Sequence, residues 1–398
     1  MTEINDLKYK CLLKVKEIEE SIALQKIETI SLMSGGSGII LFYLYLYKET
    51  KKEMYYKRAE HLVLILVDSL NKNKFSMDFA TGCSGALWML KHLSENNFIE
   101  IPANFFDEKI ISLMKDFSIS QIKNRKFDFL YGGLGPILFF IEDGWANESE
   151  FNEKILSLLK NNSIENGDGV FWDGSFFCED ENLEVNLGLA HGIPSIIYFL
   201  VKLCSENKNK SQHTIFLKKS VDWLLSNKIG NEKSISLFPT VIKNKDKHLN
   251  SRLAWCYGDL GIASILWQAG KVMKDDYIKN EAVDIMLHAS KRTDLYENQI
   301  LDAGICHGTA GVAHIFNYFF KETRIATFKE VGDYWISETL KMAKHTNSNV
   351  AGYKVWLGES RQWVDEYGLL EGGAGIGLVL LSYISDDTLS WDRCILLN

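Results

Sequence analysis

The sequence predicts an all-α protein folded as an α/α toroid, a double ring of about seven inner and seven outer helices. The first observation is a glycine turn that recurs seven times along the chain. The second is a run with few charges directly after each turn, which predicts a buried helix. The third is an amphipathic segment between successive runs, which predicts a half-exposed helix. Closing such pairs into two rings buries the inner helices on all sides, whereas a flat row leaves apolar surface bare.

The turns share a frame in which glycine stands first and, in every turn but the fourth, also three positions later. The fourth turn has Ser195 at that place and Pro194 before it, and proline is well tolerated in the first turn of a helix. The spacing of about 47 to 66 residues is typical of helical-hairpin repeats. The first glycines are Gly35, Gly82, Gly132, Gly192, Gly258, Gly308 and Gly372.

The helices follow from this frame in chain order. Residues 7–22 precede the first turn and predict a leading helix that packs on the ring as its first outer helix. The predicted inner helices are 39–47, 86–90, 137–141, 196–203, 262–267, 312–320 and 376–384. The clearest predicted outer helices are 55–71, 150–160, 214–226 and 326–343. Because the repeat runs from about residue 34 to 384, we expect a single domain over residues 1–398.

Three long inserts interrupt the repeat, at residues 162–186, 227–250 and 345–367. Loops of this length are usually functional or disordered. The second insert, which includes His248, reads as a solvated loop. All three precede a glycine turn, so we expect them to wall the mouth of the central cavity. Aromatic residues argue against disorder and either grip a peptide or pack the loops down; they are Phe171, Trp172, Phe176 and Phe177 in the first insert and Tyr353, Trp356, Trp363 and Tyr367 in the third.

Composition limits the class of partner and the compartment. A net charge of −8 argues against a nucleic-acid partner and mildly favours a cationic one. Seven cysteines, an odd number, and the lack of a signal peptide predict free thiols in a reducing cytoplasm. No apolar run reaches the roughly 18 residues of a membrane span. We therefore expect a cytoplasmic protein without a transmembrane segment, with membrane association through partners as an open alternative.

Two turns carry metal-ligating residue types. The sixth turn contains Cys306 and His307, and the fifth contains Cys256 either at the place of His307 or one residue off. Two thiolates and one imidazole match a zinc site with three protein ligands and one open position, and soft sulfur ligands favour Zn²⁺ over magnesium or calcium. Fifty residues separate the cysteines, so the prediction rests on repeat geometry. The alternative is a pair of buried free cysteines.

Three further residues are candidates for catalysis. His191 precedes Gly192 as His307 precedes Gly308, so we expect it to face the same cavity as an acid or base rather than serve as a core histidine. Asp128, before the third turn, either orients His191 and the substrate or caps the helix that follows. Arg252 stabilises a developing oxyanion such as an enolate, or merely pairs with Asp259 or Asp128.

The ligand set favours one reaction class over another. An open zinc position either activates water or binds a substrate thiol and makes it a thiolate at neutral pH. Two thiolate ligands donate electron density to the metal, which makes it a poorer Lewis acid but keeps a bound third thiolate nucleophilic. The residues therefore favour thiol alkylation over hydrolysis.

The motifs Trp255-Cys256-Tyr257-Gly258 and Cys306-His307-Gly308, with His191-Gly192 and the seven glycine turns, resemble the lanthionine synthetase C family over nearly the whole chain. The resemblance implies a seven-fold toroid with Zn²⁺ held by Cys256, Cys306 and His307. It implies an enzyme, a lantibiotic cyclase, in which the zinc-bound cysteine thiol of a dehydrated precursor peptide adds to dehydroalanine or dehydrobutyrine. It also implies His191 as the acid/base, with Asp128 and Arg252 as further active-site residues.

The resemblance also implies partners. A stand-alone cyclase of the bacterial class I pathways receives its dehydrated peptide from a separate dehydratase, and an export transporter belongs to the same biosynthetic complex. Two rival functions stay open. A prenyltransferase-like zinc alkylator of thiols needs a basic patch for a diphosphate, and the turns offer only Arg252. A non-catalytic zinc-containing binder of a peptide or of glutathione predicts that His191 is dispensable.

Overall fold

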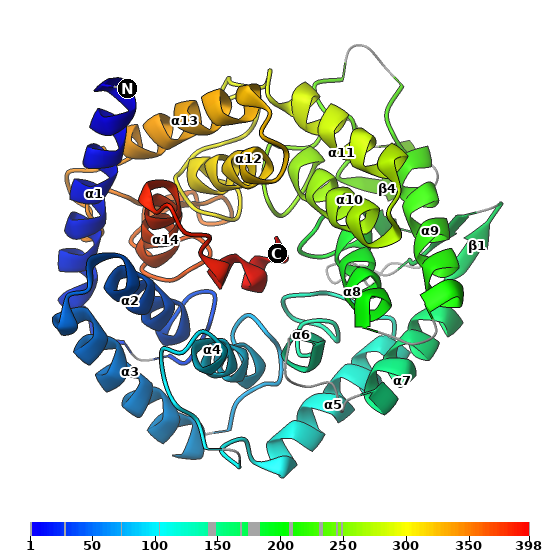
Figure 1. The fold of residues 1–398 in the computed structure, drawn as a ribbon, viewed down its shortest axis with the longest axis horizontal. Helices are drawn as coiled ribbons and strands as arrows, with labels where there is room; N and C mark the ends of the chain where they lie inside the picture. Colours follow the sequence, from blue (N-terminus) through cyan, green and yellow to red (C-terminus); the bar gives the residue numbers. More distant parts are fainter. Residues whose placement is uncertain are drawn as a thin grey trace.

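Two concentric rings of helices form the fold, seen down the ring axis in Figure 1. The inner ring consists of α2 (Gly36–Thr50), α4 (Cys83–Glu95), α6 (Ile137–Ile141), α8 (Ile193–Glu206), α10 (Asp259–Met273), α12 (Thr309–Thr323) and α14 (Gly373–Ile384). The outer ring consists of α1 (Thr2–Ala23), α3 (Glu53–Lys72), α5 (Glu108–Lys123), α7 (Ser149–Asn161), α9 (Lys210–Ser226), α11 (Asp276–Ala289) and α13 (Ala326–Lys341). Each inner helix packs against the next, and α14 packs against both α2 and α1, which closes the circle.

The computed structural model describes the chain except residues 1, 28, 73, 103, 142–148, 168, 174–183, 207–209, 231–233, 244–245, 248–249 and 398. Phe176, Phe177 and His248 therefore lie outside the described residues. The predicted toroid is confirmed, and every predicted helix coincides with an observed one apart from its ends. Of the helices that the structure describes, none has the length and apolar character needed to cross a membrane.

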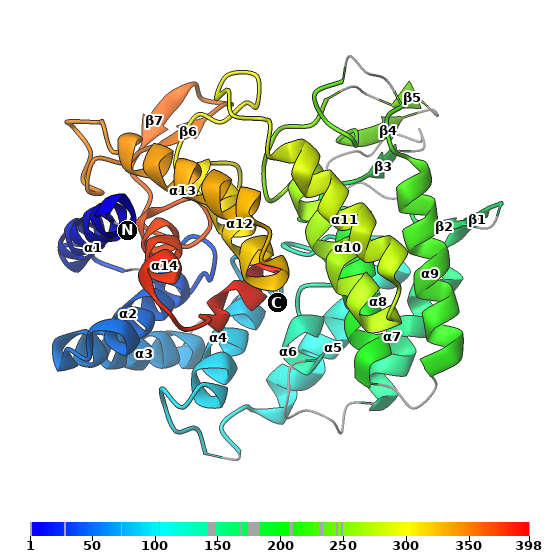
Figure 2. The ribbon, with the colours of Figure 1, turned by 45° about the horizontal axis from the view of Figure 1, so that its top comes forward.

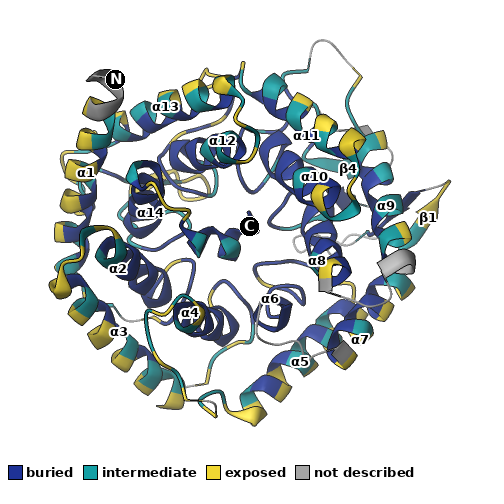
Figure 3. Ribbon diagram, viewed as in Figure 1, coloured by how far each residue is buried: buried dark blue, intermediate teal, exposed yellow. Residues whose placement is uncertain are grey.

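Burial differs between the two rings as the hydrophobic pattern predicts (Figure 3). In the inner helix α2, every residue from Gly36 to Leu46 is buried. In the outer helix α3, the buried residues are Tyr55, Ala59, Leu62 and Leu66, which recur at three and four positions and so form one stripe. The inner ring is thus core on all sides, and the outer ring shields it from water.

A closed circuit of backbone hydrogen bonds joins the seven glycine turns. Each turn donates from a residue just before its glycine to a carbonyl of the next turn, and the seventh turn donates to the first. The links are Met33 N to Ala80 O (3.1 Å), Ala80 N to Leu130 O (2.9 Å), Phe129 N to Ala190 O (3.3 Å), Ala190 N to Cys256 O (3.3 Å), Cys256 N to Cys306 O (3.2 Å), Cys306 N to Leu370 O (3.0 Å) and Leu370 N to Met33 O (2.8 Å). The circuit holds all seven turns at one end of the ring.

The inserts contain short antiparallel strands that the sequence analysis did not predict. β1 (Ile164–Asn166) pairs with β2 (Gly169–Phe171), and β6 (Val355–Leu357) pairs with β7 (Gln362–Val364). β3 (Glu184–Asn186) pairs with β4 (Val241–Lys243), which pairs with β5 (Asp246–Lys247), so the first insert is joined to the second. Strands β3 to β7 gather at one end of the ring (Figure 2).

The β1–β2 hairpin corrects the expectation that every insert walls the cavity mouth. β2 packs on the outer helix α9, where the rings of Phe171 and Trp223 stack with centroids 4.7 Å apart. Trp172 is also core: it is 2% exposed and its indole N–H donates to Leu159 O at 2.8 Å. Of the two roles left open for the insert aromatics, Trp172 therefore has the packing role, because the outer layer of helices covers it.

Candidate metal centre

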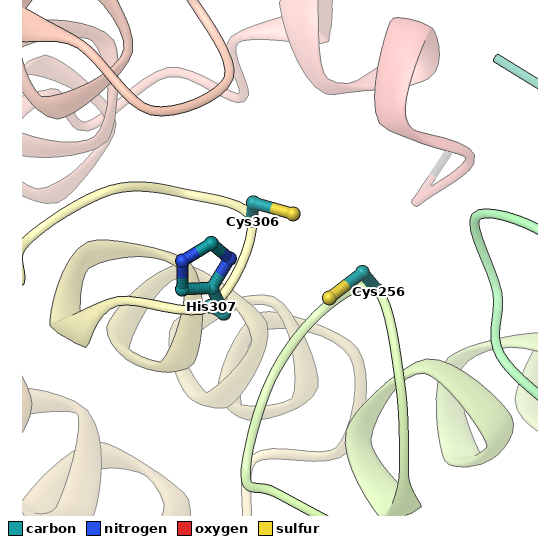
Figure 4. A group of neighbouring side chains, drawn as sticks. All are labelled: Cys256, Cys306 and His307. Carbon is teal, nitrogen blue, oxygen red and sulfur yellow. The ribbon is translucent and has the colours of Figure 1, made fainter. Parts of the chain in front are cut away.

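Cys256, Cys306 and His307 converge at the end of the ring where the glycine turns lie. Their ligand atoms lie within 4.8 Å of one another, and they form the one such group of metal-ligating side chains among the described residues. Figure 4 shows the three side chains brought together by two loops, one leading into α10 and the other into α12. The repeat frame therefore places residues fifty positions apart in a single cluster, as predicted.

The turn frame explains how each ligand is placed. Cys256 and Cys306 both stand two residues before the first glycine of their turn, so Cys256 aligns with Cys306 and not with His307. Their backbones are joined directly, because Cys256 N donates to Cys306 O at 3.2 Å. Gly258 has a φ of 91°, and a Cβ at that position would stand 2.5 Å from Arg252 O. Only glycine allows the fifth turn to close this tightly.

The three residues fit a zinc ion. Zinc bonds of about 2.3 Å to sulfur and 2.0–2.1 Å to nitrogen in a tetrahedron hold the ligand atoms about 3.5–3.8 Å apart. Atoms within 4.8 Å of one another therefore need shifts of about 1 Å or less. Cys256 is buried, and the His307 side chain is 22% exposed, so the cluster is reached from one side. The three side chains would occupy three of the four coordination positions of the zinc ion and leave the fourth for a substrate atom.

Protonation in the cluster favours a dication. The hydrogen bond with Cys306 lowers the pKa of the Cys256 thiol well below its usual range, with His307 and Arg252 acting in the same direction against burial. The same bond, together with burial, raises the pKa of Cys306. Burial works to lower the pKa of His307, but the bond to Cys256 and the charge of Asp302 outweigh it and raise that pKa. The shifts favour a thiolate at Cys256, the form in which cysteine binds a metal ion.

Two carboxylates flank His307, and sequence reasoning missed both. Asp302 Oδ2 lies 3.8 Å from Nε2 of His307, and Glu371 Oε1 lies 3.7 Å from Nδ1. Asp302 is itself fixed, because its Oδ1 accepts from Gly304 N at 3.1 Å. Carboxylates in this place orient a metal-bound imidazole. The frame held the signal: Glu371 stands immediately before its glycine, as His307 does, and Asp302 stands six residues before, as Arg252 does.

His191 and Asp128 form a second pair at the same end of the ring. Nδ1 of His191 is hydrogen-bonded to Oδ2 of Asp128, while Oδ1 of Asp128 accepts from Tyr131 N at 2.7 Å. Asp128 therefore contacts His191 and also holds the glycine turn, but it does not cap the following helix, because α6 begins only at Ile137. Its 3% exposure keeps the bond away from water. Asp78 holds the second turn in the same frame, accepting from Thr81 N at 2.7 Å, but has no histidine partner among the described contacts.

Tyr257 links the His191 pair to the metal cluster and was also missed. It follows Cys256 directly, its ring centroid lies 5.9 Å from that of His191, and its hydroxyl accepts from Nδ2 of Asn186 at 3.4 Å. Burial raises the pKa of Tyr257, and the charges of Cys256 and Asp128 add to the effect. The phenol therefore stays protonated and stands between the two halves of the site.

A cavity of about 490 Å³ opens beside His307, and we call it the mouth pocket. Arg252 lines it and does not pair with Asp259, which binds Arg292 instead at 3.1 Å. The third insert forms one wall of this pocket. For this insert, the expectation that the inserts wall the cavity mouth is confirmed, in contrast to the β1–β2 hairpin of the first insert. Residues used below that line the pocket are Arg252, Asp302, His307, Trp356, Glu359 and Glu371.

Comparison with known proteins gives three results. Residues 26–396 match the family described as lanthionine synthetase C-like protein. The nisin biosynthesis protein NisC of Lactococcus lactis subsp. lactis is 23% identical over 410 residues, covering 92% of this chain and 89% of that protein. The solved structure of a nisin cyclase superposes with a TM-score of 0.71 at 18% identity, covering 99% of this chain and 98% of the other, which shows a shared fold.

Proposed function

The chain belongs to the lanthionine synthetase C-like family, and from that premise we propose that it is a zinc-dependent lanthipeptide cyclase. Its reaction is the addition of a peptide cysteine thiol to dehydroalanine or dehydrobutyrine in the same dehydrated precursor peptide. A carbon–sulfur bond forms at the β-carbon, the carbon–carbon double bond becomes single, and the thiol proton is replaced by a proton on the α-carbon. The product is a thioether ring of lanthionine or methyllanthionine, with no other reactant consumed.

One observation carries this proposal: two thiols and an imidazole converge at the end of the ring where His191 and Asp128 form a hydrogen-bonded pair. Cys256, Cys306 and His307 would hold the zinc ion, which when bound lowers the pKa of a substrate thiol in its open position. The N-termini of α10 and α12 begin just after these ligands, and their dipoles favour the thiolates.

His191 serves as the acid/base in this proposal. Because Nδ1 is bonded to Asp128, proton exchange with the peptide falls to Nε2. Asp128 fixes the orientation of the ring and stabilises its protonated form, as a carboxylate partner does for other catalytic histidines. Repeat four supplies His191, whereas repeats five and six supply the ligands, so proton transfer and thiol activation come from separate parts of the ring.

Arg252 stabilises the developing enolate in this proposal. When sulfur adds to the β-carbon, negative charge moves to the carbonyl oxygen beside the α-carbon. Arg252 and His307 line the same mouth pocket, which supports this role, because a peptide carbonyl beside the metal ligands would lie in that space. A positive group that is already in place lowers the energy of such a charge without reorganisation.

The mouth pocket also weighs against the prenyltransferase-like alternative. Its lining contains three acids, Asp302, Glu359 and Glu371, against one arginine, Arg252, and the metal-ligand candidate His307. A diphosphate would meet repulsion there, whereas a peptide with polar and aromatic contacts would not. A dehydrated peptide is therefore the favoured substrate, made by a separate dehydratase in the cytoplasm and passed to an export transporter after cyclisation.

The test uses a synthetic dehydrated peptide that carries one dehydroalanine and one cysteine. Ring formation leaves the mass unchanged, so the readout is the loss of titratable thiol together with the loss of reactivity toward an added thiol. The protein with zinc should consume both groups in equal amounts. Binding of the peptide without loss of either group would instead support the non-catalytic binder.

A further inference from the structure

Residues 390–397, which we call the axial segment, lie inside the circle of inner helices, near the ring axis in Figure 1. They include the 3₁₀ helix η1 (Ser390–Ile395). The segment is core: Trp391, Cys394 and Leu396 are each 0% exposed. Its place brings it beneath the fifth glycine turn, because the indole N–H of Trp255 donates to Ile395 O at 2.7 Å.

The axial segment is itself held by inner helices from several sides. The indole N–H of Trp391 donates to Ser382 Oγ in α14 at 2.8 Å. Nε2 of His314 in α12 lies 2.9 Å from Oδ2 of Asp392. Further bonds join the segment to α2 and α10: Tyr45 OH to Ser390 Oγ (3.1 Å) and Gln268 Nε2 to Leu396 O (3.0 Å). Ile395 O is therefore a fixed acceptor.

Trp255 connects this fixed segment to both sulfur ligands. It directly precedes Cys256, and its backbone N–H donates to Cys306 O at 3.1 Å. The side chain is 0% exposed, so the ring has no freedom to turn without breaking contacts. Fixing the indole at one end and the amide at the other sets the orientation of the peptide bond that leads into Cys256.

We propose that Trp255 is a positioning residue for the Cys256 thiolate and that the axial segment fixes the Trp255 side chain in place. The inference rests on the metal centre of the proposed function and goes beyond it, since it assigns part of the metal affinity to a segment on the far side of the fifth turn. Removing a residue that orients a metal ligand without itself binding the metal typically weakens metal affinity 10–100-fold.

The test replaces the hydrogen-bonding indole by a ring of the same apolar character, Trp255→Phe. Zinc affinity is measured by competition with a chromophoric chelator, and the sulfur geometry by the absorption of the Co²⁺-substituted protein. We expect the affinity for zinc to fall about 10–100-fold. We also expect the sulfur-to-cobalt charge-transfer band to shift, a change that loss of fold stability alone does not produce.

A matched control separates positioning from general packing. Trp172→Phe also removes a buried indole hydrogen bond, the one to Leu159 O at 2.8 Å, but its ring packs on the outer helix α9 and contacts neither the axial segment nor a ligand. This variant should lose similar thermal stability and keep wild-type zinc affinity and cobalt spectrum. Equal effects of the two substitutions on zinc, or no effect of either, would overturn the proposal.

A second variant keeps the test decisive if Trp255→Phe does not fold. Gln268→Leu leaves Trp255 in place and removes the bonds to Leu396 O and Leu397 O, at 3.0 and 3.3 Å, next to Ile395. It should weaken zinc binding several-fold, and unchanged affinity would count against the axial segment. Ring formation by the wild-type protein is assayed in parallel. Wild-type cyclisation with unaltered zinc affinity in every variant would leave the proposed function standing and remove only this inference.

Discussion

Nδ1 of His191 is hydrogen-bonded to the carboxylate of Asp128, a residue 63 positions earlier in the chain. The contact joins the third and fourth glycine turns, and it commits one ring nitrogen to a buried acid. We predict that His191→Ala slows ring formation about 10²–10⁴-fold, because the proton donor and acceptor are lost. The measurement is the rate of thiol loss from the dehydrated peptide, with zinc content as the control.

Asp128→Asn tests the other half of the pair. An asparagine oxygen still accepts from Tyr131 N, so the turn stays closed, but the imidazolium loses its negative partner. We expect a slower reaction with zinc content and melting temperature close to wild type. If His191→Ala cyclises the peptide at the wild-type rate, both residues are structural and the proposed acid/base role falls.

Removing one sulfur ligand tests the metal centre without any substrate. The purified protein should contain about one zinc per chain, and Cys306→Ala should lose it while remaining folded, because two ligands bind zinc far more weakly than three. Cys83→Ala is the control: Cys83 is another buried cysteine beside a glycine turn, in contact with Met77 rather than with a ligand set. Retention of zinc by Cys306→Ala would show that the cluster is not the metal site.

Two tryptophans of the inserts should behave differently. Trp363 is 36% exposed and its ring contacts Trp356, a residue that lines the mouth pocket, with centroids 5.2 Å apart. Trp363→Ala should raise KM for the peptide about 2–12-fold, the effect of one aromatic contact of about 0.5–1.5 kcal/mol. Zinc content should not change.

Trp172 serves as the contrasting case. Because it is buried among outer helices, Trp172→Ala should lower the free energy of unfolding by about 3–5 kcal/mol and leave KM of the remaining folded protein unchanged. Chemical denaturation and steady-state kinetics on both variants check the pair. A raised KM for Trp172→Ala at full folding would place the first insert at the substrate after all.

Acid should destabilise the protein through His92. Burial, with a smaller effect from Arg393, lowers the pKa of His92 to about 3, whereas the unfolded chain has a pKa near 6.5. Between these values the unfolded state binds a proton that the folded state does not, so stability falls as pH falls below about 6.5. At pH 4.5 the loss from this residue is about 2–3 kcal/mol.

The measurement is the free energy of unfolding from pH 7.5 to 4.5. His92→Gln starts less stable, because it loses the 2.8 Å bond with Tyr45, but it should show a shallower pH dependence. His61→Gln, an exposed position on α3, should keep the wild-type slope. Equal slopes in all three proteins would show that His92 does not titrate differently in the folded and unfolded states.

The sequence was sufficient for the parts of the structure that repeat. The glycine frame predicted the double ring and brought Cys256, Cys306 and His307 together, because each turn occupies an equivalent place. It did not predict Glu371 or Asp302 beside His307, although both stand at frame positions that carry candidate site residues in other turns. A carboxylate before a glycine turn can also serve only to hold that turn, as Asp78 does, so residue type alone does not decide.

The inserts and the axial segment lay beyond sequence reasoning for a different reason. Neither repeats, so no frame fixes where its side chains point. Trp172 and Trp363 look alike as aromatics in polar loops, yet one packs under α9 and the other borders the cavity mouth. Residues 390–397 carry no motif, and their role is visible only from contacts with helices that are distant in the sequence, such as Gln268 to Leu396.

The closed circuit of turns has a consequence for synthesis. Cys306 N donates to Leu370 O, and Leu370 N donates to Met33 O, so the earliest and latest parts of the ring complete one another. At about 5–20 residues per second, roughly 3–13 s separate the making of Cys306 from that of Leu370. During that interval both cysteines exist without the neighbouring turn that encloses them. An oxidant that reaches the nascent chain then would join the two thiols to each other, and a cell that makes this protein must keep them reduced until the last turn docks.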